Sequence, residues 1–160
     1  MKILIAYAGK SGTTEKCAKL LGEKLPGASV VNLNLETPEI GGFNTVIVGG
    51  SIRMGQLHKK AKNFIEQNSQ SLKTKRTAYF ICCGFTGNAP KLFSDNFSKE
   101  LLDRAVDHEC FGGEMKLENL HGFDRFIAGM VAKSGEGKNT PPPQISYENI
   151  GRMAAKIIGE

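Results

Sequence analysis

Short, uninterrupted apolar runs recur along the chain, and segments with helical spacing separate them. Runs of this length that are rich in Val and Ile are typical of parallel strands buried on both faces of a sheet. The sequence predicts such strands at residues 2–8, 29–33, 45–50, 77–83 and 108–115. We expect the last strand to be the weakest, because Gly112 and Gly113 interrupt it.

Apolar residues at intervals of three and four predict amphipathic helices between these strands. The predicted helices cover residues 13–25, 57–72, 90–106, 123–133 and 146–158. Pro26 and Gly27 follow the first helix, and Ser146 is suited to cap the last one. Residues 134–144 are rich in Gly and Pro and form a predicted loop.

This alternation predicts an α/β fold, a three-layer doubly wound sandwich around a five-stranded parallel sheet. A chain of 160 residues, 40% of them hydrophobic, has the size of one domain, which we expect to span residues 1–160. Ligands of such folds bind beyond the carboxyl ends of the strands. We therefore expect a site in the loops that follow the first, third and fourth strands.

The loop after the first strand has the residues of a phosphate-binding loop. Residues 9–14 join a buried strand to a helix, whose first N–H groups lack partners and whose dipole favours an anion. The hydroxyls of Ser11, Thr13 and Thr14 add hydrogen-bond donors, and Gly12 allows close approach. We predict that this loop binds a phosphate group, and a capped helix start without a ligand is the alternative.

Two other nucleotide-binding motifs do not fit this loop. A Walker A loop needs a glycine where Leu4 stands, although Gly9, Lys10 and Ser11 match the end of that motif. The dinucleotide fingerprint G-x-G-x-x-G is missing from the same segment.

The loop resembles the FMN phosphate loop of flavodoxins, [ST]-x-[ST]-G-x-T. Ser11, Gly12 and Thr14 match that pattern, while Gly9 replaces its first hydroxyl residue. The resemblance covers almost the whole chain, and it implies FMN as cofactor and a sheet in the order 2-1-3-4-5. It also implies cofactor contacts in three loops. These residues are Gly9, Lys10, Ser11, Gly12, Thr13, Thr14, Ser51, Ile52, Arg53, Met54, Gly55, Cys83, Gly84, Phe85, Thr86, Gly87 and Asn88.

A narrower resemblance links the chain to the menaquinone-dependent protoporphyrinogen dehydrogenase family. It rests on residues 50–55 with His58 just beyond them, and on residues 123–126 and 133–135. It implies an oxidoreductase of haem biosynthesis that oxidises protoporphyrinogen and passes electrons to a quinone. Residues 84–96 are less basic than the corresponding insert of that family, which leaves the substrate open.

Two other functions remain open at this point. The chain could be a non-enzymatic electron-transfer protein of the flavodoxin type, or an FMN-free module that binds another phosphate. The absence of tryptophan, with Phe85 as the one aromatic residue in a predicted flavin loop, favours an exposed ring that a small organic substrate can contact. A cation at Arg53 would raise the flavin potential, as suits a quinone acceptor, and a surface arginine paired with a carboxylate is the alternative.

Candidate catalytic residues are not defined by any motif. His58 is either a proton donor or a structural residue at a helix start. The four cysteines lack metal-ligand spacing, and we interpret them as reduced packing thiols. Neighbouring residues of a strand point to opposite faces, so Cys82 and Cys83 are not expected to share a metal.

Charge and hydropathy limit the kinds of partner and the cellular location that we expect for this chain. The net charge of +5 favours anionic partners, but no RNA-binding or helix-turn-helix motif accompanies it, so nucleic acid is not expected. No apolar run is long enough to span a bilayer and no signal peptide is recognisable, so the expected location is cytoplasmic. The apolar stripe at residues 123–131 either packs on the core or touches the inner face of the membrane. Expected partners are a redox protein or a quinone, and the oligomeric state is left open.

Overall fold

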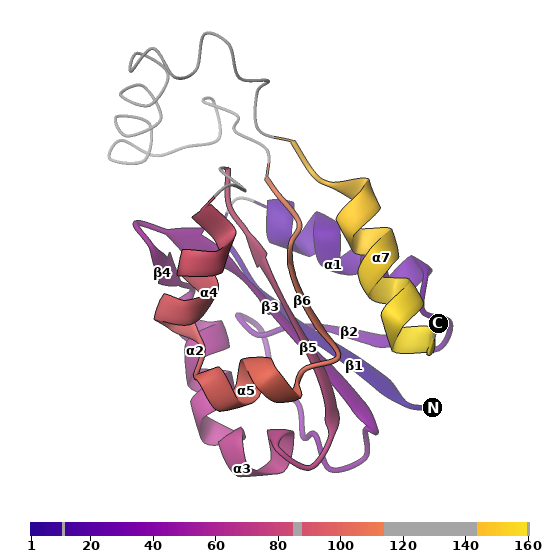
Figure 1. Ribbon diagram of the computed structural model, residues 1–160. Helices are drawn as coiled ribbons and strands as arrows, with labels where there is room; N and C mark the ends of the chain where they lie inside the picture. Colours follow the sequence, from indigo (N-terminus) through magenta and orange to yellow (C-terminus); the bar gives the residue numbers. More distant parts are fainter. Residues whose placement is uncertain (11, 85–87, 114–143, 160) are drawn as a thin grey trace, which may run out of the picture.

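Five parallel strands form the central sheet in the computed structural model, which describes residues 1–10, 12–84, 88–113 and 144–159 (Figure 1). They are β1 (Ile3–Ala8), β2 (Ser29–Asn32), β3 (Thr45–Arg53), β5 (Arg76–Cys82) and β6 (Asp107–Cys110). Their order in space is β2-β1-β3-β5-β6, with every pair parallel. Counted along the chain, these parallel strands stand in the predicted order 2-1-3-4-5. The predicted α/β class is therefore confirmed.

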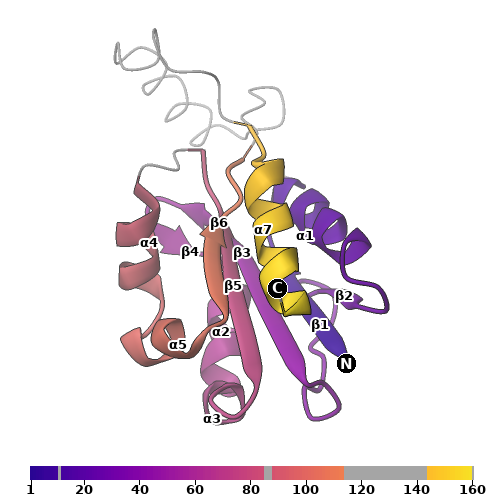
Figure 2. The same ribbon diagram turned by 45° about the vertical axis from the view of Figure 1, so that its right-hand side comes forward.

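Helices cover both faces of the sheet (Figure 2). One face packs against α1 (Thr13–Glu23) and α7 (Tyr147–Ile158). The other face packs against α2 (Lys59–Gln67), α3 (Ser69–Leu72), α4 (Ala89–Asn96) and α5 (Lys99–Arg104). Each face has its own apolar core, and this is the predicted three-layer arrangement. Among the described helices, none is long and apolar enough to cross a membrane.

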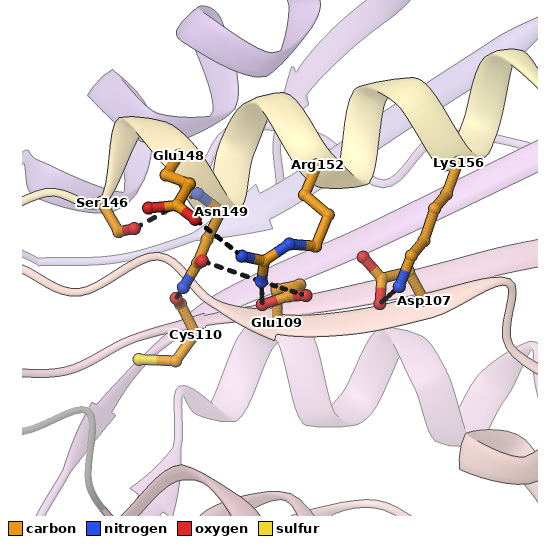
Figure 3. Close-up of polar contacts among 8 residues, drawn as sticks. All are labelled: Asp107, Glu109, Cys110, Ser146, Glu148, Asn149, Arg152 and Lys156. Carbon is orange, nitrogen blue, oxygen red and sulfur yellow. Dashed lines mark hydrogen bonds and ion pairs between the residues drawn. The ribbon is translucent and has the colours of Figure 1, made fainter. Parts of the chain in front are cut away.

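The sheet is held to α7 by a polar network along its edge strand β6 (Figure 3). Arg152 bonds Glu109 at 3.2 Å and Glu148 at 3.0 Å, and Lys156 bonds the buried Asp107 at 3.1 Å. Arg152 and Glu148 are partly exposed, so the pairs of Arg152 add little stability. The pairs Arg152–Glu109 and Lys156–Asp107 join the last helix to the last strand, whereas Arg152–Glu148 lies within α7.

The predicted helix over residues 57–72 is wrong at its start and is interrupted near its end. Instead, β3 continues to Arg53, and the chain turns back as β4 (Gln56–Leu57), which pairs antiparallel with β3. Only then does α2 begin, with His58 as its N-cap. Asn68 ends α2 and leads directly into the short α3.

The predicted helix over residues 90–106 is also two helices. Phe97 takes an extended conformation after α4, which places its ring in the core, and Ser98 then caps α5 by accepting a hydrogen bond from the Leu101 N–H. The fifth parallel strand ends at Cys110, earlier than predicted. The predicted helix at 123–133 and nearly all of the loop at 134–144 lie outside the described residues.

Two glycines of β3 are needed for packing. A Cβ on Gly49 would lie 2.0 Å from the ring of Phe80, which stacks on Phe111. A Cβ on Gly50 would lie 2.7 Å from Leu57 on the other face of the strand. These glycines, which precede the second predicted flavin loop, leave room for the side chains of Phe80 on the neighbouring strand β5 and of Leu57 on β4.

Candidate functional site

The three predicted flavin loops begin at one edge of the sheet, because the strands before them are in register. Ala8 of β1 lies beside Gly50 of β3, and Ser51 lies beside Cys82 of β5. Parallel strands end at the same edge, so Gly9 and Cys83 leave the sheet beside the point where β3 continues past Ser51 into its hairpin. In Figure 1 this is the upper edge, where α1 and α4 begin.

The first loop turns into α1 through a left-handed glycine. Gly12 is the N-cap, with φ 88°, and as a glycine it has no side chain with which to cap the helix. The first N–H groups of an α-helix lack intrahelical partners, so this end attracts an anion. Thr13 begins the helix, and Lys10 is exposed beside it. Ser11 lies outside the described residues.

The glycine that departs from the flavodoxin pattern has a packing reason. Thr14 is buried, and a Cβ on Gly9 would lie 2.6 Å from its Oγ1. A hydroxyl residue at position 9 would therefore displace Thr14. The Gly9 carbonyl also accepts a hydrogen bond of 3.1 Å from the Asn34 side-chain amide, which fixes the start of the loop.

The second loop is a β-hairpin that extends beyond the sheet. Ser51, Ile52 and Arg53 belong to β3 itself, and the turn is made by Met54 and Gly55, with φ of 52° and 78°. Two successive left-handed residues are typical of a tight hairpin turn. Met54 is 71% exposed at the tip. The buried Oγ of Ser51 has no hydrogen-bond partner in the described part of the chain, so it can accept or donate to a ligand.

One side chain of α4 holds this hairpin in place. The Asn96 Oδ1 accepts a hydrogen bond of 2.9 Å from the Leu57 N–H, and its Nδ2 donates one of 2.9 Å to the Gly55 carbonyl. Asn96 therefore links the second loop to the helix that follows the third. Sequence analysis did not identify this residue, because an asparagine near a helix end has no distinctive pattern.

Positive charge gathers at this edge around His58. Its Nδ1 accepts a hydrogen bond of 3.1 Å from the Lys60 N–H, which requires that nitrogen to be unprotonated. Burial lowers the pKa of His58, and the charges of Lys10, Arg53 and Lys60 lower it further. Lys10 from the first loop and Arg53 from the second thus act on the same histidine. Of its two predicted roles, the structural one at a helix start is the one this geometry supports.

The third loop is described only at its two ends. Cys83 and Gly84 follow β5, and the exposed Asn88 precedes α4, whereas Phe85, Thr86 and Gly87 lie outside the described residues. The Cys83 N–H donates a hydrogen bond of 3.0 Å to the Gly112 carbonyl. Its Sγ lies 3.3 Å from the Sγ of Cys110, a proximity that sequence analysis missed because it depends on the register of β5 and β6.

The described members of the predicted site thus surround one edge of the sheet. Cofactor binding by each of them stays a prediction.

Comparisons with known proteins agree with this geometry. The profile of a family described as flavodoxin domain matches residues 4–141. Protoporphyrinogen IX dehydrogenase (quinone) of Escherichia coli K12 is 22% identical over 175 aligned positions, covering 98% of this chain and 94% of that protein. The same enzyme of Escherichia coli O157:H7 gives the same figures. The predicted resemblance to these families is confirmed.

Solved structures support the fold. A flavoprotein of Lactobacillus acidophilus in complex with FMN has a TM-score of 0.53 at 14% identity, covering 68% of this chain and 92% of that one. Rubredoxin oxygen:oxidoreductase of Desulfovibrio gigas has a TM-score of 0.52 at 16% identity and covers 99% of this chain. The present chain spans 37% of the length of that second structure.

Replacing Asn96 with alanine should loosen the hairpin. The Asn96→Ala variant loses the bonds to Leu57 and Gly55, at a cost of roughly 1–3 kcal/mol in the free energy of unfolding. Urea denaturation measures the change. Ser94→Ala, an exposed substitution on the same helix, is the matched control and should lie close to wild type. Equal stability of the two variants would contradict the role given to Asn96.

Acid should remove stability through His58. The pKa of His58 is lower in the folded chain than in the unfolded one. Its contribution to the free energy of unfolding is therefore complete above about pH 6.5, and it falls as the pH drops from there to the pKa of the folded chain. His58→Asn keeps an oxygen that can cap α2 but does not titrate. Between about pH 7.5 and about pH 5.5, wild type should lose more unfolding free energy than this variant. Equal losses in urea titrations would refute the assignment.

Proposed function

We propose, because the chain belongs to the flavodoxin domain family, that it binds FMN at the carboxyl edge of its sheet and works as a flavin-dependent oxidoreductase. The observation that carries this proposal is the meeting of three loops at that edge, with a glycine N-cap at the helix start in the first loop and three cations around His58. An anionic group on a planar ring is the ligand that suits such a site. The flavin would supply the one- and two-electron chemistry that side chains lack.

The residues present fit this cofactor. Gly9, Lys10, Gly12, Thr13 and Thr14 are the described residues that would hold the phosphate, together with the predicted Ser11. The open helix start supplies N–H donors, and Lys10 supplies positive charge. The unpartnered Ser51 hydroxyl would be satisfied by a polar atom of the cofactor.

The second and third loops would flank the ring. On the second loop these residues are Ser51, Ile52, Arg53, Met54 and Gly55, and on the third they are Cys83, Gly84, Asn88 and the predicted Phe85, Thr86 and Gly87. Asn96 would act as a positioning residue, since it fixes the hairpin backbone.

Protoporphyrinogen with a quinone acceptor is the substrate pair that we propose. Support comes from the likeness to the E. coli enzyme, which extends over 98% of this chain. The exposed Met54 offers an apolar, adaptable contact at the tip of the hairpin, and a flat hydrophobic substrate suits such a surface. The chain's own residues would orient the substrate and exclude water, while the flavin accepts the electrons.

Arg53 should raise the flavin potential. A half-buried cation on the second loop favours the anionic reduced cofactor. Arg53→Ala should therefore lower the two-electron potential by about 20–40 mV, the equivalent of roughly 1–2 kcal/mol. Spectroelectrochemistry of the FMN-loaded protein measures it. Lys99→Ala removes one charge from an exposed position on α5 and should leave the potential unchanged. An unchanged two-electron potential in Arg53→Ala would contradict the proposal that Arg53 raises the flavin potential.

An anaerobic assay tests the proposed reaction. FMN-loaded protein is mixed with protoporphyrinogen and a menaquinone analogue, and porphyrin fluorescence is followed against protein without FMN. Porphyrin formation that needs both flavin and quinone is expected. A fully flavin-loaded protein that forms no porphyrin would refute this substrate, and a flavodoxin-type electron carrier would become the leading account. If the protein takes up no FMN, the remaining account is an FMN-free module that binds another phosphate.

A further inference from the structure

Two cysteines from neighbouring strands meet on one face of the sheet. Ile81 of β5 lies beside Cys110 of β6, and Cys83 stands two residues beyond Ile81, hence on the same face. The Sγ atoms of Cys83 and Cys110 are 3.3 Å apart. A disulfide needs about 2.0 Å, so the sulfur atoms must approach by only about 1.3 Å.

The backbone around this pair is held on both sides. The Cys83 N–H bonds the Gly112 carbonyl at 3.0 Å, and the Phe111 N–H bonds the Ile81 carbonyl at 2.9 Å. The Asn149 amide donates a hydrogen bond of 2.8 Å to the Cys110 carbonyl. Figure 3 shows the Cys110 sulfur directed away from α7. The two thiols are therefore positioned toward each other by the fold.

The surroundings favour the thiolate of Cys110. The hydrogen bond with Cys83 lowers the pKa of Cys110 to about 7 against the opposing effect of burial, and the Gly112 N–H, 3.4 Å from its Sγ, contributes in the same direction. The thiolate is the reactive form of cysteine, so Cys110 is the nucleophile of the pair.

An open pocket adjoins Cys110, whose own exposed fraction is 5%. Cys110 lines an open pocket of about 400 Å³ between β6, α4 and α5, together with Phe93, His108 and Asn149. Cys83 is itself partly exposed. The pocket has room for a small oxidant.

The other two cysteines form an internal contrast. Cys17 and Cys82 lie in the core on the opposite face of the sheet, and they are buried, as Cys110 is, so the contrast lies in their surroundings. A hydrogen bond with Cys17 and burial raise the pKa of Cys82 well above its ordinary value. This second pair stays in the thiol form, which reacts slowly.

We propose that Cys83 and Cys110 are a redox-active dithiol that hydrogen peroxide oxidises to an intramolecular disulfide. The Cys110 thiolate attacks one peroxide oxygen, the O–O bond breaks, and Cys110 sulfenic acid and hydroxide form. Cys83 gives its proton to this hydroxide and attacks the Cys110 sulfur. The S–O bond breaks and a second hydroxide leaves, which takes up the proton that Cys110 released when it ionised. Two thiols and one peroxide thus become one disulfide and two waters, each sulfur losing one electron. A dithiol reductant reverses the step by exchange.

The disulfide would tie the start of the third loop to β6. Cys83 is the residue at which the chain leaves β5, so the bond fixes the position from which that loop departs. The reaction needs no flavin, and its test is therefore independent of the proposed function.

Thiol counting with peptide mapping tests the proposal on the full chain. Reduced protein is treated with hydrogen peroxide at neutral pH, denatured, and assayed for free thiols. Free thiols should fall from four to two. Tandem mass spectrometry of tryptic peptides should place the bond between Cys83 and Cys110, and a dithiol reductant should restore all four thiols. The rate should rise as the pH passes through about 7.

Variants separate this pair from the pair of Cys17 and Cys82. Cys83→Ser and Cys110→Ser should each abolish the disulfide, whereas Cys17→Ser should form it at the wild-type rate. A bond that joins Cys17 to Cys82 would overturn the proposal. The proposal would also be overturned if oxidation of the wild-type protein stopped at sulfinic acid, or if all four thiols survived the treatment. Both results are measured on the wild-type protein, so they do not depend on whether the variants fold.

Discussion

The register of β1, β3 and β5 is the constraint on which the rest of the site depends. Hydrogen bonding aligns Ala8 with Gly50 and Ser51 with Cys82, so three loops leave the sheet at one edge. That register requires tight lateral packing, because Phe80 occupies the space where Gly49 would carry a side chain. A residue larger than glycine there would displace the Phe80 ring from the core. The positions of the loops are thus decided in the core, some distance from any ligand.

Electrostatics and hydrogen bonds then shape the edge. The left-handed Gly12 opens α1 toward solvent, and Lys10 and Arg53 bring positive charge from two different loops. Asn96 joins the hairpin to α4, so the second and third loops are linked through one side chain. Each contact is modest, but together they define an anion-attracting edge beside an exposed apolar tip. That combination suits a phosphorylated planar cofactor and a hydrophobic substrate.

The sequence predicted the layers well because buried parallel strands leave a strong signal. A continuous, β-branched run such as Val46–Val48 is typical of a strand covered on both faces. The hairpin was missed because Arg53 and Gln56 are polar and Leu57 fits a helical stripe equally well. The break at Ser98 had a signal, a capping residue before Lys99 and Glu100, but the apolar spacing of Phe97 and Leu101 concealed it. The meeting of Cys83 with Cys110 depends on strand register, which composition and periodicity do not encode.

Recognition of the phosphate at the edge of the sheet is the central claim, and a paired titration tests it most directly. Protein freed of bound flavin is titrated with FMN and, separately, with riboflavin, which has the same ring but no phosphate, while flavin fluorescence is followed. Two or more charge-assisted hydrogen bonds to the phosphate predict that FMN binds at least about 100-fold more tightly. Equal affinities, or no binding of either compound, would contradict the account.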